Sequence, residues 1–330
     1  MAARAAQCSA SFHFPGSISM KRILTPLVAG ILAFGIAACS KQGPGSAPAG
    51  DASAAAADGK VTVGLAVSTL NNPFFVELRD GAAAEAKRQG VNLITVDAQD
   101  DPAKQQASVE DLIQKKVSVI LINPTDSSAV ANVVKEATSK GIKVVSLDRS
   151  VNGAEVSAHI ASDNIAGGVM AGKYLLDKLG GKGRIVELEG IAGSSAARER
   201  GEGFHQVVDK KEGVKLLAKQ PADFDRAKGL SVMENIIQGN KDIQGVFAHN
   251  DEMALGAVKA IQAAGLKNVA VVGFDATPDA VAAVKAGTLS ATVQQQPALI
   301  GQYGVQAAKK LADGQKVDKF IPVPLNLVQQ

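Results

Sequence analysis

Side chains able to bind or transform a ligand come directly after apolar runs at several points along the chain. Asp148–Arg149 follows VVSL, His249–Asp251 follows VFA, and Asp275 follows VVGF. Runs of this kind, rich in β-branched residues, are typical of strands that are buried on both faces. Open α/β sheets bind ligands at the carboxyl ends of their parallel strands, so the pattern predicts a ligand site at these positions.

The first apolar run leads into the same kind of site. VTVGLAV is followed by Ser68–Asn72 and then by Pro73. Asn before a Pro is a helix-start signal, because Asn accepts from free N–H groups and Pro at the first helical position needs no acceptor. Phe74 and Phe75 come next, in a chain that is only 4% aromatic. Polar groups and rings are therefore expected together at the end of this strand.

Most of these polar residues also have a purely structural explanation. Asn72, Asp126, Asp251 and Thr277 stand where helix caps are favoured, and capping is the preferred interpretation of the last three. No helical pattern follows Asp148–Arg149, so a buried ion pair and a ligand clamp explain that pair equally well.

Patterns of common enzymes are missing from the sequence. The first strand is followed by no glycine fingerprint for a dinucleotide, and GIAGSS at 190–195 lacks the Gly-Lys-Ser/Thr ending of a P-loop, so a tight turn and cap is preferred to an anion site. The four histidines form no metal pair at helical spacing, and there is no GxSxG nucleophile. His249 is the remaining candidate for a general base, but no nucleophile or partner accompanies it. We therefore predict no enzyme, no cofactor and no metal.

Composition narrows the class of partner. The 330 residues, 46% of them hydrophobic, are enough for two modest domains. The formal charge is +3, and from Lys60 onward 31 basic side chains face 30 acidic ones. This balance argues against a nucleic acid or an anionic membrane held by bulk charge. Both cysteines, Cys8 and Cys39, precede Lys60, so the globular part has no disulfide.

The N-terminus has the pattern of an export signal. Lys21–Arg22 precedes a mostly apolar run, Ile23–Ala38, that ends in small residues and is short for a membrane span. We predict a signal peptide at 1–38. Within it, Met20 is the expected start and 1–19 a mis-assigned extension.

Cys39 follows Ile36-Ala37-Ala38, which resembles a bacterial lipobox. Lipidation of Cys39 is favoured over an ordinary cleavage site that happens to lie beside a cysteine, because small residues abut the thiol and a tether follows. Residues 39–59, rich in Gly, Pro and Ala, predict a flexible linker. The protein is expected in the periplasm or cell envelope, with a possible lipid anchor at Cys39.

From Lys60 onward, strand-like and helix-like segments alternate at short spacing, which predicts parallel strands with right-handed helical crossovers. Pro322 and Pro324, in the last extended piece at 320–328, fit an edge or a crossover better than a central barrel strand. Two open sheets are therefore favoured over one closed barrel. The predicted strands are 61–68, 92–96, 117–122, 143–147, 184–189, 214–218, 245–248, 269–273 and 289–294, and the predicted helices are 74–89, 103–115, 127–140, 164–179, 196–211, 226–238, 252–264, 278–285 and 297–311.

Several long stretches carry a family resemblance: VSTLNNPFF (67–75), LINPTDS (121–127), LDR (147–149), HIASDN (159–164), ELEGIAGSSAARERGEGF (187–204), QPADFDR (220–226), NDEMALGA (250–257) and VVGFDATPD (271–279). Together they resemble the type I periplasmic sugar-binding family, which shares its core with LacI-like regulators, and within it the ribose-binding members. The resemblance implies an α/β fold with two Rossmann-like lobes, whose parallel sheets are joined by a hinge of three crossovers. The implied lobes are 60–162 with 296–324 and 163–295 with 325–330.

The family's sugar contacts carry over motif by motif. Two aspartates and two arginines among them balance in charge, which suits a neutral polyol, and the rings can cover the apolar faces of a sugar. The sequence departs from the family at His249, where another polar residue is expected, and at Ala276, where Gly is expected. The implied ligand-binding residues are Asn72, Phe74, Phe75, Asp148, Arg149, Arg200, Phe224, Asn250, Asp275 and Gln295.

The resemblance implies a function without covalent chemistry. The expected role is to bind D-ribose between the lobes and deliver it to the permease of an ABC importer by hinge closure. A monomer is expected, and binding of the closed form to a chemoreceptor stays open. The alternatives are another pentose or hexose, a furanosyl signalling molecule, the effector-binding core of a LacI-type regulator, or a sugar-modifying enzyme.

Overall fold

The computed structural model describes residues 60–330. The predicted signal peptide at 1–38, the linker at 39–59 and the lipidation site at Cys39 lie outside the described residues. The strands are β1 Thr62–Val67, β2 Asn92–Asp97, β3 Val119–Ile122, β4 Lys143–Leu147, β5 Ala158–Ala161, β6 Gly183–Glu189, β7 Val214–Pro221, β8 Gly245–Ala248, β9 Ala270–Asp275, β10 Ala291–Gln294, β11 Phe320–Pro322 and β12 Asn326–Gln329. The helices are α1 Pro73–Gln89, α2 Pro102–Gln114, α3 Ala131–Ser139, α4 Asn164–Lys178, α5 Ser195–Val208, α6 Arg226–Gly239, α7 Asp251–Ala263, α8 Pro278–Lys285 and α9 Pro297–Ala312.

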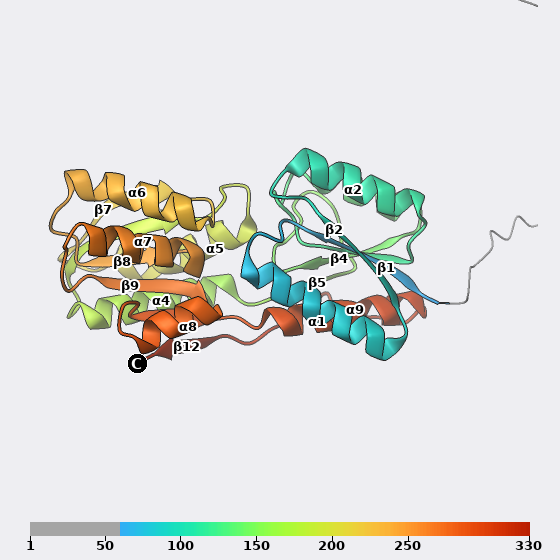
Figure 1. Cartoon of the computed structure of the whole chain (residues 1–330). Coiled ribbons are helices and arrows are strands. Elements are labelled where there is room, and N and C mark those ends of the chain that lie inside the picture. The colour runs from blue at the N-terminus through green and yellow to red at the C-terminus, as the bar shows by residue number, and fades with distance from the viewer. Residues whose placement is uncertain (1–59) are drawn as a thin grey trace, which may run out of the picture. The chain divides into compact units, whose positions relative to one another are not determined.

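The strands form two open sheets, each in its own lobe (Figure 1). The first sheet has the order β11-β5-β4-β3-β1-β2, and the second has the order β12-β10-β9-β8-β6-β7. Neighbouring strands are parallel except for β12, which is antiparallel to β10. The prediction of two parallel-sheet lobes rather than one barrel is confirmed.

The chain crosses between the lobes three times, after β5, after β10 and between β11 and β12. Pro322 ends the edge strand β11, and Pro324 lies in the crossing that follows it. The predicted single extended piece at 320–328 is therefore two short strands in different sheets. The division of strands is clear, whereas the predicted lobe limits, 60–162 with 296–324 and 163–295 with 325–330, stay a prediction.

One further strand and the start of one helix also differ from the prediction. The strand β5 was not predicted, because its four residues include the polar His159. The helix predicted at 127–140 begins only at Ala131, because Asp126 Oδ1 accepts from the backbone N–H groups of Ser128 and Ala129 and so holds a turn there.

Each sheet is buried on both faces, as its apolar strands require. In β1, Leu65 packs with the α1 and α9 side chains, and the adjacent Ala66 packs with those of α2 and α3. Alternate strand residues face opposite layers, so continuous apolar runs are needed. Within residues 60–330, no helix combines the length and apolar character required to cross a bilayer.

Three pairs of helices approach one another through glycines. Between α1 and α9, a Cβ on Gly301 would overlap the carbonyl oxygen of Leu78, and one on Gly81 would overlap that of Ala298. The pairs Gly168 and Gly203 between α4 and α5, and Gly229 and Gly256 between α6 and α7, are packed in the same way. A side chain at these points must push the helices apart.

We expect Gly301→Ala to lower the free energy of unfolding by about 2 to 3 kcal/mol, because the added methyl group meets rigid backbone rather than a movable side chain. Urea denaturation followed by circular dichroism measures this. Gly239→Ala is the matched control, since a Cβ there meets nothing within 4 Å, and it should leave stability unchanged or slightly raised. Equal effects of the two substitutions would contradict the close-approach explanation.

Candidate functional site

The predicted contact residues come together in one buried cavity between the lobes. It is lined by nine of the ten predicted residues, with Ala196 added. The tenth, Gln295, donates a hydrogen bond to Asp275 Oδ1 at 2.9 Å.

Buried charge distinguishes this cavity from larger hollows on the surface. The hollow of about 690 Å³ beside Tyr174 and Gln330 is larger, but the charged side chains that line it, Asp177 and Lys178, are exposed. In the cavity, Asp148, Arg149, Arg200 and Asp275 are all at most 6% exposed. Charges are buried at such cost that they normally need partners. We therefore identify the smaller cavity as the candidate site.

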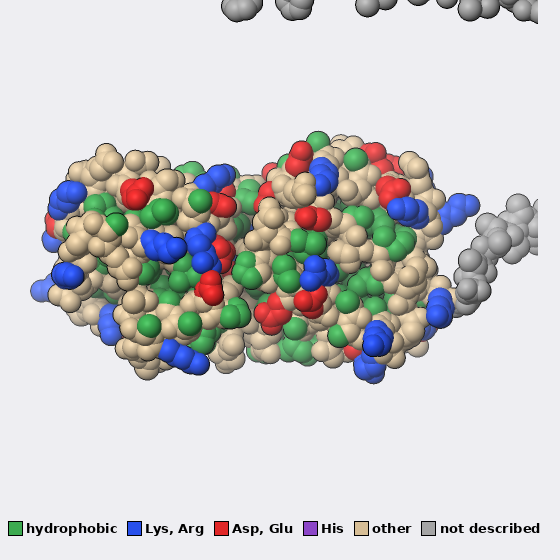
Figure 2. All heavy atoms as spheres, in the orientation of Figure 1, with side chains coloured by type: hydrophobic (Ala, Val, Ile, Leu, Met, Phe, Trp, Pro, Cys, Tyr) green, Lys and Arg blue, Asp and Glu red, His purple; other side chains and the backbone are tan. Residues whose placement is uncertain are grey.

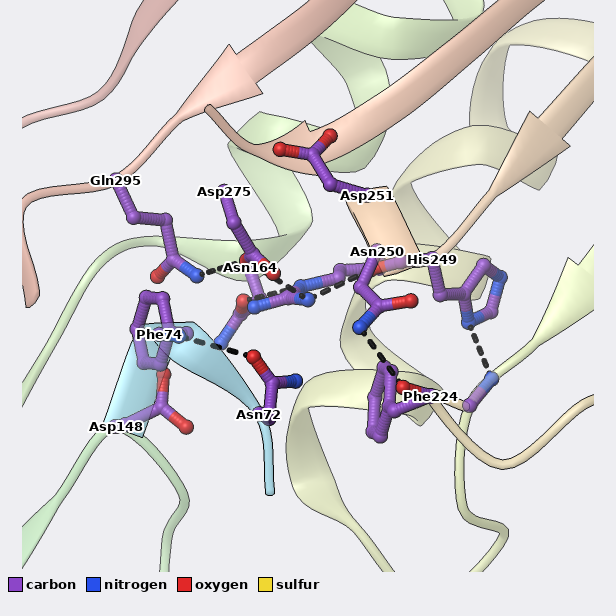
Figure 3. Close-up of polar contacts among 12 residues, drawn as sticks. Asn72, Phe74, Asp148, Asn164, Phe224, His249, Asn250, Asp251, Asp275 and Gln295 are labelled. Carbon is purple, nitrogen blue, oxygen red and sulfur yellow. Dashed lines mark hydrogen bonds and ion pairs between the residues drawn. The ribbon is translucent and has the colours of Figure 1, made fainter. Parts of the chain in front are cut away.

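The start of α1 supplies the first wall. Asn72 Oδ1 accepts from the Phe74 N–H at 3.0 Å, which caps the helix as its position predicted. Its amide group nevertheless lines the cavity, so capping and ligand contact are compatible (Figure 3). The rings of Phe74 and Phe75 lie edge to face, with centroids 5.1 Å apart. They present apolar surface to the cavity beside the polar amide.

Asp148 and Arg149 supply the polar part of the same wall. Asp148 Oδ2 accepts from Asn123 Nδ2 at 3.2 Å and lies 3.8 Å from Arg149 Nε. Its other oxygen, Oδ1, is buried and has no hydrogen-bond partner among the described residues. Burial raises the pKa of Asp148, and the charges of Arg149 and Arg200 oppose that rise. A ligand hydroxyl would satisfy the unpaired oxygen.

The guanidinium of Arg149 connects the two lobes. Its Cζ lies 5.1 Å from the ring centroid of Phe75 and 5.3 Å from that of Phe224, which belongs to the second lobe. Nη1 donates to the Pro124 carbonyl oxygen at 3.0 Å. The planar group is therefore fixed between two rings, with its remaining N–H groups available at the cavity.

Arg200 is the matching arginine of the second lobe. Its Nε donates to Asn164 Oδ1 at 2.9 Å, and its Nη1 donates to the His249 carbonyl oxygen at 2.6 Å. Nη1 also lies 3.7 Å from Asp275 Oδ1. Burial raises the pKa of Asp275 well above its usual value, and the charge of Arg200 opposes this. Gln295 Oε1 is a further buried oxygen without a partner in the described part of the chain.

The structure corrects two predicted caps, one at the start of α7 and one at the start of α8. Asn250, not Asp251, caps the helix, since its Oδ1 accepts from the Met253 N–H at 3.0 Å. Asp251 instead accepts from the Thr277 N–H at 2.7 Å and from Thr292 Oγ1 at 2.6 Å. Thr277 lies at the cap position of α8, but its side chain makes no capping bond. Burial raises the pKa of Asp251 to about 7. Asn250 also donates to the Phe224 carbonyl at 3.1 Å, which links it to the cavity wall.

Backbone strain gathers at the cavity. Asp148, Phe224 and Asp275 all line it and have φ values of 62°, 60° and 118°, in the region that favours glycine. Ala276 also lies there, at 59°, where the family resemblance predicted a glycine. Strained residues persist where surrounding contacts over-determine them, and such sites are commonly functional. The strain therefore supports a binding role for these three residues.

The cavity offers binding rather than catalysis. Its two arginines and two aspartates balance in charge, and none of the described residues forms a cluster of three or more groups able to hold a metal. His249, the candidate base, is fully buried, and its Nε2 lies 2.9 Å from Glu187 Oε1. The sequence did not predict a role for Asn164 or Glu187 beside the cavity, although a glutamate between the apolar Val186 and Leu188 is a recognisable signal.

The lobes also touch directly beside the cavity. The Ser127 N–H donates to the Gly193 carbonyl at 3.0 Å, and the Ser195 N–H donates to Ser127 Oγ at 3.1 Å. Ser195 Oγ in turn accepts from the Ser150 N–H at 2.9 Å. We call Ser127, Ser150, Gly193 and Ser195 the seam. Because it bonds one lobe to the other, the structure has the lobes closed over the cavity.

Comparison with known proteins decides the family. The model for the periplasmic binding protein domain matches residues 63–316. The chain belongs to the periplasmic binding proteins. It is 54% identical over 269 residues to the ribose import binding protein RbsB of Bacillus subtilis, covering 82% of this chain and 87% of that protein. It is 36% identical to the D-allose-binding periplasmic protein of Escherichia coli, covering 78% and 86% of the two chains.

A solved structure agrees with this assignment. The Caulobacter myo-inositol binding protein bound to myo-inositol has a TM-score of 0.78 and 32% identity, and the match covers 82% of this chain and 93% of that one. Proteins of this family are solute-binding components of ABC importers rather than enzymes, and they are periplasmic. On the face seen in Figure 2, basic and acidic side chains are interspersed, in keeping with the nearly balanced charge.

Proposed function

We propose that this protein binds D-ribose in the cavity between its lobes and delivers it to the permease of an ABC importer. The observation that carries the proposal is the buried set of two arginines, two aspartates and three phenylalanine rings, contributed by both lobes and balanced in charge. Charge-assisted hydrogen bonds to hydroxyls reject analogues that leave these groups unpaired. The 54% identity to ribose import binding proteins supports ribose as the sugar.

The ten predicted residues would divide the work between polar and apolar contact. Asp148, Asp275 and Gln295 would accept from sugar hydroxyls; Asp148 Oδ1 and Gln295 Oε1 are two of the buried oxygens that lack a partner among the described residues. Arg149 and Arg200 would donate to hydroxyl and ring oxygens, and Asn72 and Asn250 would add amide contacts. Phe74, Phe75 and Phe224 would cover the C–H faces of the ring.

Delivery would depend on closure. Contacts from both lobes exist together only when the lobes meet, so the sugar shifts the population toward the closed form. The permease would then bind surfaces that closure brings into register. We propose that the protein acts as a monomer, and that lipidation of Cys39 tethers it to the membrane. A chemoreceptor that binds the closed form would likewise bind surfaces that closure brings into register.

Calorimetric titration of the purified protein with ribose, xylose, arabinose, galactose and glucose tests the ligand. Any co-purified sugar is first removed by partial unfolding and dialysis. Tight binding of one ribose per chain, with the other sugars at least about a hundredfold weaker, is the expected result, because a misplaced hydroxyl leaves a buried group unpaired. Tight binding of another sugar instead would keep the transport role and replace the ligand.

A further inference from the structure

His249 contacts the cavity indirectly, through its neighbours. Its ring is fully buried, and its Nε2 lies 2.9 Å from Glu187 Oε1, a carboxylate that is also fully buried in β6. Figure 3 shows the ring on the side of the backbone away from Asp148 and Phe74. The His249 ring is not among the predicted sugar contacts and does not line the cavity. Another role must therefore explain the buried histidine–glutamate pair.

The hydrogen bonds define which ring nitrogen carries the proton. The Gly190 N–H donates to His249 Nδ1 at 3.4 Å, so Nδ1 must be unprotonated. The proton is then on Nε2, where it is donated to Glu187 Oε1. A second proton, on Nδ1, would face the Gly190 N–H and break that contact. The arrangement therefore fits a neutral ring in one tautomer only.

His249 supports two of the groups that line the cavity. Its carbonyl oxygen accepts from Arg200 Nη1 at 2.6 Å. Its ring packs on Gly201, the residue after Arg200, where a Cβ would lie 3.3 Å from His249 Cε1. The Gly190 backbone that bonds its ring lies flat under Phe224, since a Cβ on Gly190 would overlap that ring. A displacement of His249 would therefore change the positions of both Arg200 and Phe224.

We propose that His249 is a positioning residue: its neutral ring, held in the Nε2–H form by Glu187, fixes Arg200 and Phe224 at the sugar, so that sugar affinity requires this ring to be neutral. The inference rests on the proposed function and adds to it a dependence on pH. It concerns a position at which this sequence departs from the residue that the family resemblance predicted.

The charges around the ring set the direction of the effect. Burial lowers the pKa of His249, and Glu187 opposes this, with smaller contributions from Arg200 and Glu189. Burial alone would raise the pKa of Glu187, but the hydrogen bond from His249 and the nearby histidine and lysine charges hold it below its usual value. The second oxygen of Glu187 lies 2.8 Å from His205 Nε2.

These pKa shifts determine the direction in which sugar affinity changes with pH. A histidine with a lowered pKa is neutral at neutral pH and takes up its proton only below about pH 6.5. Sugar affinity should then be full above that pH and fall as acid protonates the ring. Removing the negative charge with Glu187→Gln should move the fall to still lower pH, because the protonated ring loses its stabilising partner.

Calorimetric titration with ribose at about pH 7.5 and about pH 5.5 tests this, using the wild type and single variants of His249 and Glu187. We expect the wild type to bind about fivefold more weakly at the lower pH, which corresponds to loss of one or two hydrogen bonds. His249→Gln keeps a donor and an acceptor without a titrating proton, so it should lose most of this pH dependence. His249→Ala keeps neither and should bind more weakly than His249→Gln at both pH values.

The other described histidines provide matched controls. His205→Gln removes the half-buried ring on the same carboxylate, and His159→Gln removes the ring that bonds Ser146 in the first lobe. Both should keep the wild-type fall in affinity. The inference is overturned if His249→Gln keeps that fall, or if either control abolishes it. Titration of the buried Asp251 remains in every variant, so the difference between variants, not the wild-type curve, is decisive.

A measurement without sugar separates this inference from the proposed function. In ¹⁵N NMR of the sugar-free protein, His249 should show the Nε2–H tautomer at neutral pH, and the Gly190 amide should shift as the ring titrates. An Nδ1–H tautomer would overturn the inference even if ribose binds. Failure of ribose to bind at neutral pH, with the Nε2–H tautomer present, would instead overturn the proposed ligand.

Discussion

Replacing Arg149 with alanine should weaken ribose binding about a thousandfold, or about 4 kcal/mol. The guanidinium is 3% exposed and lies between the rings of Phe75 and Phe224, one from each lobe. Its loss removes donors to the sugar, removes the group that bridges the two rings, and leaves Asp148 buried without the neighbouring positive charge. Few single changes at the cavity remove contacts from both lobes at once.

Two further variants make this result specific. Arg149→Lys keeps the charge but not the planar fork, so it should recover only part of the affinity. Arg79→Ala removes an arginine on the outer face of α1 whose partner is Asp80, and it should leave ribose affinity unchanged. Calorimetry gives the affinities, and a thermal melt confirms that each variant is folded. If folded Arg149→Ala binds within about tenfold of the wild type, the assigned site is wrong.

The strand positions could be predicted because the physics that sets them is local. Lys143–Leu147 and Gly245–Ala248 are apolar runs bounded by turn residues, and both have the predicted bounds in the structure. The short strand β5 could not be found in this way, because four residues carry too little pattern of their own. It forms because β4 and β11 lie on either side of it. Pairing in space, rather than sequence, defines such a strand.

The cavity residues were predicted from motifs, whereas their geometry was not predictable. Nothing in the sequence indicates that the Asp148 and Asp275 backbones have φ values of 62° and 118°, or that Asn250 rather than Asp251 caps α7. Both depend on what the folded lobe places beyond the strand end. Asp251 is drawn away from the cap by Thr277 and Thr292, which come from other elements of the same lobe.

Contacts between the lobes are still harder to predict from the sequence. Asp126 was predicted only as a helix cap, but it instead holds the turn before α3 by accepting from the N–H groups of Ser128 and Ala129. The same carboxylate lies against Gly193 of the other lobe, at a point where a Cβ on Gly193 would overlap it. Since its hydrogen bonds to the turn hold Asp126 in place, a side chain at Gly193 obstructs closure of the seam.

Gly193→Ala should therefore act against the closed form alone. The Gly193 φ is not in the left-handed region, so alanine is tolerated by the backbone, and in an open form Asp126 would be distant. Overpacking of this kind costs about 2 kcal/mol. Because the sugar binds the closed form, ribose affinity should fall about thirtyfold while the thermal stability of sugar-free protein stays nearly unchanged.

A double-mutant cycle with Asp126→Ala tests whether this pair of residues is responsible. Removing the carboxylate leaves room for the added methyl group, so the double variant should bind ribose more tightly than Gly193→Ala alone, despite the lost turn cap. Small-angle scattering should show that Gly193→Ala needs more ribose than the wild type to become compact. Additive effects of the two substitutions would mean that the seam does not limit closure, and that the sugar contacts alone determine how far the equilibrium between open and closed lobes is shifted.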